Sequence, residues 1–241
     1  MLVAQRYDKI VELVNDRGSI RVSELSELFG VTEETIRRDL DRLESAGKLR
    51  RSHGGAVSVK DQPVQPLQPE VPYAQREITK ADEKQRIATA AVGMIVPKDR
   101  ILLDASTTAW YMARIMPDIP LTVLTNSIKV AMELAAKEKI EVISTGGRLA
   151  RGSLSYVGHL AEQSMDAYHV DKLFFSCKGV HLERGISESN EQQARIKQKM
   201  LGMADRVILL ADSSKFGQQA FTHVADLGQI DTIVTDEQLP A

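Results

Sequence analysis

Residues 101–110 read ILLDASTTAW, an apolar run that stops at Asp104 and leads into three consecutive hydroxyl side chains. The run Ile101–Leu103 is typical of a buried strand, and the pattern after Ser106 is helical. In a parallel sheet, ligands bind outside the carboxyl ends of the strands, where the loops into the helices gather. The stretch therefore predicts one βα unit of a parallel sheet, with a polar loop at the ligand-binding edge.

The same alternation continues to the end of the chain. Six strand-like runs are separated by helical stretches: ILLD, LTVLTN, IEVISTGG, KLFFSC, RVILLAD and TIVTD. Such repetition predicts a largely parallel α/β sheet with helices on its faces. Four of the strand ends carry small polar residues, namely Asp104 with Ser106-Thr107-Thr108, Thr125-Asn126-Ser127, Thr145-Gly146-Gly147, and Asp212-Ser213-Ser214-Lys215.

These strand ends predict a site for a phosphorylated, hydroxylated ligand. Hydroxyls that enter a helix N-terminus supply donors, free amides and a favourable dipole for a phosphate, and the carboxylate of Asp104 can accept hydrogen bonds from sugar hydroxyls. Each cluster alone is more typical of an ordinary helix N-cap. Four clusters on one sheet edge favour the ligand site.

A proline-rich segment divides the chain. Residues 61–72, DQPVQPLQPEVP, contain four prolines and three glutamines, which interrupt any helical or strand period. Proline removes amide donors and biases its neighbours toward extended conformations, so the segment predicts a semi-rigid spacer. We expect an N-terminal module at 1–57, a linker at 58–73 and a C-terminal domain at 74–241.

The composition is that of a cytoplasmic globular protein. The 241 residues are 43% hydrophobic and 27% charged, and the formal net charge is −2, which excludes a globally basic nucleic-acid coat. Cys177 is the only cysteine, so neither a disulfide framework nor a cysteine zinc site is expected. No apolar run approaches the roughly 18 to 20 residues that span a bilayer. We expect no metal, cofactor or membrane partner.

The N-terminal module contains three short amphipathic helical patterns. Their apolar faces consist of Tyr7, Ile10, Val11 and Val14, then Leu25, Leu28 and Phe29, then Ile36, Leu40 and Leu43. Gly18, Gly30 and Gly47 end the three patterns, and Thr32 is placed to cap the third. The pattern predicts a helix, a tight turn and a second helix.

The third helix and the segment after it are basic. Arg38 and Glu34 point away from the apolar face at 100° per residue, with Arg37 and Arg42 on its flanks. The segment KLRRSHGGAV predicts a hairpin, and residues 37–51 contain six basic and three acidic residues. A solvated face with i,i+4 ion pairs would explain an isolated charged helix. An N-capped helix before a basic hairpin instead favours major-groove insertion with phosphate anchoring.

The segment GVTEETIRRDLDRLESAGKLRRSHGGAV resembles the winged helix-turn-helix signature of the DeoR family of bacterial transcriptional regulators, through its Thr-Ile-Arg-Arg-Asp-Leu core and His-Gly-Gly wing. The resemblance implies a recognition helix that carries Thr35, Arg37 and Arg38, and a wing that carries Arg51 and His53. Double-stranded operator DNA is then the expected partner. The complete predicted DNA-binding set is Thr32, Glu34, Thr35, Arg37, Arg38, Arg42, Arg50, Arg51 and His53.

The resemblance extends over nearly the whole chain, from Arg76 and Lys84 through TNSIKVA, STGGRL and DSSKF to IVTD. It implies a sugar-phosphate sensor domain similar in fold to ribose-5-phosphate isomerases and coenzyme A transferases. The Asp-x-x-Thr-Thr loop looks like the phosphate-binding turn of the family, in which Ser106 replaces a more usual glycine. The predicted effector-binding residues are Asp104, Ser106, Thr107, Thr108, Thr125, Asn126, Gly146, Gly147, Lys178, Lys197 and Lys215.

Two stretches bear on the identity of the sugar. LDASTTAWYMARIMPDI and FFSCKGV resemble members tied to fucose-type and related deoxyhexose operons, which suggests a deoxyhexulose 1-phosphate as effector. Trp110 and Tyr111 in the first stretch are able to stack on a sugar, but aromatic residues that enter a helix behind a strand are more often core.

Three functions remain to be weighed. The first is a non-enzymatic transcription factor, usually a repressor of a carbohydrate-utilisation operon, that responds to a sugar phosphate and forms a homo-oligomer to read two half-sites. The second is a sugar-phosphate isomerase with an accessory DNA-binding module, in which Asp104, Glu191 and lysines are acid/base groups. The third is a DNA-binding protein without sequence preference, which the overall acidity disfavours. The winged helix and proline spacer favour the first.

Overall fold

The computed structural model describes residues 3–17, 19–45, 48–52, 54–58 and 71–239 of the chain, whose contacts divide it into two compact units, 1–67 and 68–241. Most of the linker predicted at 58–73 lies outside the described residues, but its two ends do not. Ser58 pairs with Leu49 in a sheet, and Tyr73 begins a helix with its side chain buried. Folded structure therefore includes both terminal residues of the predicted linker.

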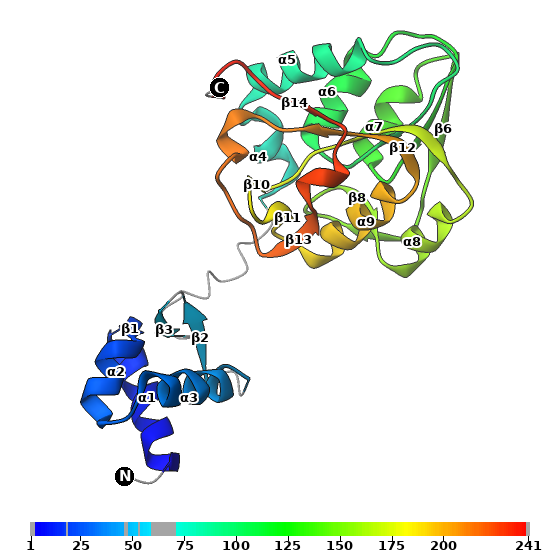
Figure 1. Cartoon of the computed structure of the whole chain (residues 1–241). Helices are drawn as coiled ribbons and strands as arrows, with labels where there is room; N and C mark the ends of the chain where they lie inside the picture. The colour runs from blue at the N-terminus through cyan, green and yellow to red at the C-terminus, as the bar shows by residue number, and fades with distance from the viewer. Residues whose placement is uncertain (1–2, 18, 46–47, 53, 59–70, 240–241) are drawn as a thin grey trace. The chain divides into compact units, whose positions relative to one another are not determined.

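The N-terminal unit is a winged helix-turn-helix domain (Figure 1). Its elements are α1 (Val3–Arg17), β1 (Ser19–Arg21), α2 (Val22–Phe29), α3 (Glu33–Ser45), β2 (Leu49–Ser52) and β3 (Gly55–Ser58). The three strands form an antiparallel sheet in the order β1-β3-β2. Gly30 ends α2 in the left-handed conformation, with φ 62°, so a short turn separates α2 from α3.

Two details of this unit differ from the sequence expectation. Strand β1 was not predicted, because its three residues contain a single apolar side chain, Ile20, and their extended conformation depends on pairing with β3. Leu28 was assigned to the apolar face of α2, yet its side chain is 54% exposed. The predicted core residues Ile10, Leu25, Ile36 and Leu40 are fully buried.

The C-terminal unit is built on a six-stranded parallel sheet in the order β14-β12-β9-β4-β5-β6. All six predicted runs form its strands: β4 (Arg100–Leu103), β5 (Leu121–Thr125), β6 (Ile140–Ser144), β9 (Val170–Phe175), β12 (Ala204–Leu210) and β14 (Thr232–Val234). Ile101 and Leu103 belong to one core cluster and Leu102 to another, so the sheet is buried on both faces. The parallel α/β prediction is confirmed.

Helices cover the sheet on both sides. The first cluster includes residues of α4 (Tyr73–Ile78), α5 (Ala81–Val92), α6 (Thr107–Ile115) and α7 (Ile128–Leu134), and the second includes residues of α8 (His159–Met165) and α9 (Glu191–Leu201). Trp110 is buried in the first cluster, as expected of a core residue. No helix in the described ranges is both long and apolar enough to span a membrane.

Five short strands outside the large sheet were not predicted. They are β7 (Arg148–Ala150) with β8 (Ser155–Val157), and β10 (Gly179–His181) with β11 (Gly185–Glu188) and β13 (Thr222–Ala225). Short 3-10 turns η1 (Ser213–Lys215) and η2 (Leu227–Gln229) accompany them. Such short strands lack an apolar period of their own and form only through pairing.

Candidate nucleic-acid interface and effector site

Helix α3 presents a polar face to solvent because its apolar residues face the core. Ile36, Leu40 and Leu43 are buried, and the Thr32 hydroxyl accepts a hydrogen bond from the Thr35 amide at 3.3 Å, as expected of an N-cap. The remaining predicted contact residues of this face are exposed, namely Glu34, Arg37, Arg38 and Arg42. The face is available to a large polyanionic partner.

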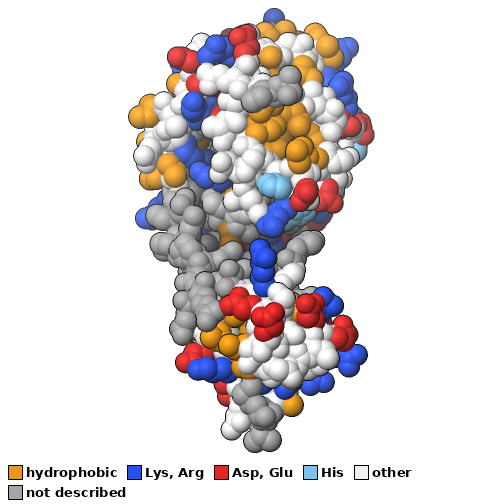
Figure 2. Space-filling model, turned by 60° about the vertical axis from the view of Figure 1, so that its left-hand side comes forward, with side chains coloured by type: hydrophobic (Ala, Val, Ile, Leu, Met, Phe, Trp, Pro, Cys, Tyr) orange, Lys and Arg blue, Asp and Glu red, His pale blue; other side chains and the backbone are white. Residues whose placement is uncertain are grey.

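The arginines of α3 are held by weak pairs. Arg37 donates to Glu33 at 2.8 Å and Arg38 lies 3.4 Å from Glu34, and the four side chains are 48–76% exposed. Figure 2 shows acidic and basic side chains side by side on the visible face of this unit. Exposed i,i+4 pairs contribute about 0.3–0.5 kcal/mol, so transferring these arginines to phosphates or base edges costs little.

The wing forms where the sequence predicts it. Arg50 and Arg51 lie in β2, whose partners in β3 are Val57 and Ala56. The side chains of both arginines, and His53, lie outside the described residues. Arg42 is already engaged, since its guanidinium donates to the Tyr7 hydroxyl of α1 at 3.1 Å.

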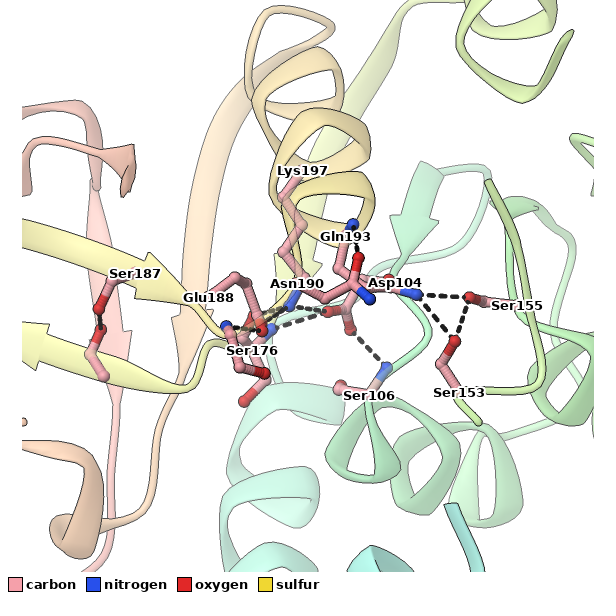
Figure 3. Close-up of polar contacts among 12 residues, drawn as sticks. Asp104, Ser106, Ser153, Ser155, Ser176, Ser187, Glu188, Asn190, Gln193 and Lys197 are labelled. Carbon is pink, nitrogen blue, oxygen red and sulfur yellow. Dashed lines mark hydrogen bonds and ion pairs between the residues drawn. The ribbon is translucent and has the colours of Figure 1, made fainter. Parts of the chain in front are cut away.

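The predicted polar clusters of the C-terminal unit all follow carboxyl ends of the parallel sheet. Asp104 follows β4, Asn126 follows β5, Thr145 follows β6 and Asp212 follows β12. Strand β9 lies between β12 and β4 in the sheet, so its end contributes a fifth residue, Ser176, that sequence reasoning did not assign. Figure 3 shows Ser176 beside Asp104 and Lys197.

Asp104 joins two of these loops. Its side chain is 1% exposed, and its oxygens accept the amide hydrogens of Ser106 and Ser176, each at 3.1 Å. The ammonium of Lys197 lies 3.4 Å from the same carboxylate. The protein already uses this carboxylate, and the role of Asp104 as an acceptor of sugar hydroxyls stays a prediction.

Lys197 lies at the centre of a buried charge network (Figure 3). It projects from α9, pairs with Glu188 of β11 and with Asp104, and donates to the Ser176 carbonyl at 2.5 Å. Burial alone would lower the pKa of Lys197, but the two carboxylates outweigh it and hold that pKa above its usual value. Glu188 was not predicted, and no motif in the sequence points to it.

Two further lysines, Lys84 and Lys215, interact electrostatically near the same edge. Lys215 donates to the Ser176 hydroxyl at 2.5 Å. Lys84 is buried and donates to the carbonyls of Arg76 at 2.5 Å and Thr79 at 2.6 Å. Burial, followed by repulsion from Lys215, lowers the pKa of Lys84 to about 8. A bound anion would relieve that repulsion, so Lys84 joins the candidate site, although it was absent from the predicted set.

Two of the predicted hydroxyls serve local structure. The Ser106 hydroxyl caps α6 by accepting the Ala109 amide hydrogen at 3.0 Å. The Thr125 hydroxyl donates to the Leu103 carbonyl at 2.7 Å and accepts from the Ser127 amide at 3.0 Å. Thr107 and Thr108 are buried as the first two residues of α6, at the positive end of its dipole.

The remaining predicted residues differ in their surroundings. The Asn126 amide nitrogen donates to the Tyr156 carbonyl at 3.0 Å, whereas its buried oxygen has no hydrogen-bond partner within the described residues. Gly146 and Gly147 have φ 63° and 109°, and a Cβ on Gly147 would meet Ala161 at 2.9 Å while one on Gly146 would meet nothing. The Lys178 side chain is exposed, unlike the other predicted lysines.

Both units of the chain match models of a known protein family. Residues 79–237 match the DeoR C terminal sensor domain, and residues 6–62 match the DeoR-like helix-turn-helix domain. The chain belongs to the DeoR family. The expected family is therefore confirmed for both units, and this DeoR-family chain is a DNA-binding transcriptional regulator.

DeoR-family relatives match along almost their full length. The chain is 56% identical over 239 residues to the Bacillus subtilis (strain 168) protein named uncharacterized HTH-type transcriptional regulator YulB, covering 99% of this chain and 91% of that protein. It is 39% identical to the L-fucose operon activator of Haemophilus influenzae, covering 98% and 92%. It is 38% identical to a putative aga operon transcriptional repressor of Escherichia coli O157:H7, covering 99% and 88%.

Solved structures give more distant matches to this DeoR-family chain. The full-length sorbitol operon regulator SorC from Klebsiella pneumoniae aligns with a TM-score of 0.45 and 13% identity, covering 98% of this chain and 96% of that one. Ribose 5-phosphate isomerase A from Methanocaldococcus jannaschii aligns with a TM-score of 0.43 and 16% identity, covering 57% and 55%.

Proposed function

We propose that this DeoR-family regulator represses a carbohydrate-utilisation operon and that a phosphorylated sugar bound in the C-terminal unit modulates its DNA binding. The observation that carries the proposal is the Lys215 ammonium at the polar strand ends, where it donates to the Ser176 hydroxyl at 2.5 Å and where its charge helps to lower the pKa of Lys84. A phosphate placed there neutralises the two ammonium groups, and the neighbouring hydroxyls and amides recognise the sugar.

On the DNA side, α3 enters the major groove and the β2–β3 wing anchors the phosphate backbone. Arg37 and Arg38 exchange their partners Glu33 and Glu34 for base edges or phosphates. Arg50, Arg51 and His53 of the wing contact phosphates, which sets affinity and salt dependence more than sequence preference.

On the effector side, the predicted residues separate into two groups. The first group holds the loops in place, because its members are already hydrogen-bonded, ion-paired or closely packed within the protein: Asp104, Ser106, Thr125, Gly147 and Lys197. The second group contacts the ligand, because its members are able to form a further hydrogen bond or allow a ligand to approach the backbone: Lys84, Lys215, Thr107, Thr108, Gly146 and the Asn126 amide oxygen. Lys178 stays a predicted contact.

The route from effector to linker runs through α4, the first described helix after the linker. Lys84 donates to the carbonyls of Arg76 and Thr79 at the end of this helix, and the Tyr73 amide donates to the Gly152 carbonyl at its start. A phosphate that draws the Lys84 ammonium away weakens the hold on α4. A six-residue helix has little stability of its own, so its position is easily shifted.

The single tryptophan offers a direct readout of this shift. Lys129 lies 5.6 Å from the Trp110 ring centre and 5.7 Å from that of Tyr73 in α4. Movement of α4 should therefore change the emission of Trp110 when the effector binds. An unchanged spectrum at saturating effector would contradict this route without contradicting effector binding itself.

A ligand screen tests the effector proposal. We expect a sugar phosphate at 100 times its dissociation constant to stabilise the protein by about 2.7 kcal/mol in a thermal-shift assay, while the free sugar does not. A deoxyhexulose 1-phosphate is the first candidate, and the aldose phosphates are the comparison set.

Threonine-to-valine substitutions then test the site. Thr107→Val and Thr108→Val remove a hydroxyl at nearly constant volume, so DNA binding should persist while its response to the sugar phosphate is lost. Thr122→Val is the matched control, because that hydroxyl lies near the opposite end of β5 and contacts Glu141. Full release of DNA by effector in both α6 variants would place the sensor elsewhere.

The isomerase alternative gains no support from the site. Asp104 and Lys197 form a buried pair, and Glu191 is exposed at the start of α9. Incubation of the purified protein with pentose and hexose phosphates should give no interconversion, and turnover would support the isomerase alternative.

Sedimentation with and without operator DNA tests the proposed homo-oligomer.

A further inference from the structure

The N-terminal unit contains a largely buried ion pair between two elements that are far apart in sequence. The guanidinium of Arg6 in α1 donates to the carboxylate of Asp39 in α3 at 2.6 Å, and the two side chains are 11% and 6% exposed. The Arg37–Glu33 and Arg38–Glu34 pairs of α3 are far more exposed. Asp39 is therefore the carboxylate of α3 that is directed inward against another helix.

Because the pair is largely buried, it adds little to the stability of the unit, but it restricts the orientation of α3. Removing two charges from water costs several kcal/mol, and well-packed apolar residues often replace a buried pair without loss of stability. The apolar contacts of Ile36, Leu40 and Leu43 are non-directional, so they define the rotation of α3 less sharply than a hydrogen-bonded ion pair does. A carboxylate held at hydrogen-bond distance resists such rotation.

A second contact strengthens the same link. The residue after Arg6, Tyr7, accepts a hydrogen bond from Arg42 at 3.1 Å, three residues beyond Asp39 on α3. Two consecutive residues of α1 thus hold two residues of α3 that are about one helical turn apart. Together these contacts restrict the rotation of α3 about its axis and its sliding along α1.

We propose that Arg6 and Asp39 are positioning residues for operator recognition: their buried pair holds α3 in the rotation that directs Arg37 and Arg38 to the DNA, without contact to the DNA by either member. Asp39 directly follows those two arginines in sequence, so any rotation of α3 that moves Asp39 moves them as well. The pair also neutralises a carboxylate that would otherwise repel phosphates. The inference rests on the assignment of α3 as the recognition helix.

Paired substitutions in the full-length protein separate positioning from stability. Asp39→Asn weakens the directional contact, and Arg6→Met/Asp39→Leu replaces both charges by apolar groups. Arg6→Lys is the conservative rescue, and Glu12→Gln is the matched control, since Glu12 forms an exposed α1 pair with Lys9. Each variant is titrated against a duplex selected by the wild type from a random library and against a scrambled duplex.

We expect the apolar double variant to melt close to the wild type yet to lose about tenfold in the ratio of selected to scrambled affinity, comparable to one mismatched base pair. Asp39→Asn should lose a similar ratio, Arg6→Lys should retain part of it, and Glu12→Gln should retain all of it. A folded double variant that discriminates as well as the wild type would overturn the inference and leave the pair with a purely structural role.

The design also separates failure of the inference from failure of the recognition-helix assignment. If Arg38→Ala retains full discrimination in the same titration, α3 does not read the operator and both fall. If Arg38→Ala loses discrimination but the folded double variant keeps it, only the inference falls. If Asp39→Asn fails to fold, the double variant still distinguishes a positioning role of the pair from a purely structural one.

Discussion

The outer face of α3 and the carboxyl edge of the six-stranded sheet carry similar charged residues in opposite surroundings. The Arg38 side chain is 76% exposed and pairs loosely with Glu34, whereas Lys197 is 8% exposed and contacts Asp104, Glu188 and the Ser176 carbonyl. In the proposed DNA complex, the first arrangement exchanges its partners for DNA at little cost. The second is expensive to disturb, because each group that loses its partner stays buried.

The difference teaches how to separate contact residues from supporting ones. An exposed charge with a weak partner is suited to binding, and a buried charge that is neutralised by buried groups of opposite charge is suited to holding loops together. By this criterion we expect Asp104 and Lys197 to support the proposed effector site, although Asp104 was predicted as a ligand from its position at a strand end and Lys197, which lies on α9, from the family resemblance.

The largest expected effect is that of removing the buried cation. Lys197→Met leaves Asp104 and Glu188 buried without their cation, so we expect a loss of about 3–5 kcal/mol in the free energy of unfolding. Urea unfolding followed by Trp110 fluorescence measures it, since the single tryptophan reports on the C-terminal unit. Lys178→Met, at an exposed lysine, should change stability by less than about 0.5 kcal/mol. Equal effects of the two substitutions would erase the contrast between buried and exposed charges.

A smaller effect, on binding rather than on folding, is expected on α3. Arg38→Ala should weaken operator binding by about 1–3 kcal/mol while leaving the melting temperature nearly unchanged. Arg51→Ala in the wing should instead weaken binding to all duplexes and reduce the salt slope by about one unit. Electrophoretic titrations at several salt concentrations check both variants. Unchanged affinity in a folded Arg38→Ala protein would contradict the placement of α3 in the major groove.

The buried amine of Lys84 should make stability depend on pH. Its folded pKa of about 8 is below its usual value, so between about pH 8 and 10.5 the unfolded chain binds more protons and stability rises with pH. The rise should be of the order of 1 kcal/mol after solvent screening. The Lys84→Met variant should lack this rise in stability. Burial raises the pKa of the Cys177 thiol to about 11, but both proteins contain Cys177, so its contribution cancels when the wild type is compared with the variant. Parallel pH profiles of the two proteins would contradict the burial of a charged Lys84.

The smallest effect is expected for the exposed pair on α3. Glu33→Gln removes the nearer acidic partner of Arg37, and we expect a change in unfolding free energy of about 0.5 kcal/mol or less. Affinity for DNA should rise slightly, because a negative charge near the phosphates is lost. A destabilisation above about 1 kcal/mol, measured by thermal unfolding, would show that the outer pairs of α3 are structural after all.

Apolar patterns predicted the large elements, because each N-terminal helix buries one face and the strands of the parallel sheet are apolar runs buried on both faces. The six runs of the parallel sheet and the three N-terminal helices all formed, with Ile101 and Leu103 facing one core and Leu102 the other. The strands β1, β7, β8, β10, β11 and β13 could not be predicted in the same way. Each has only three or four residues, and pairing with a distant segment determines its conformation.

The sequence by itself therefore determined the family, the two-unit organisation of helix-turn-helix and parallel sheet, and the strand ends at which polar residues collect. Those features depend on local patterns, and local patterns are visible along a chain. Only the tertiary structure decided that Ser176 and Glu188 complete the network of Lys197, that the charge of Lys215 acts on Lys84, and that Arg6 reaches Asp39. Partners of a buried charge come from whichever elements pack against it, and that packing is a property of the folded chain as a whole.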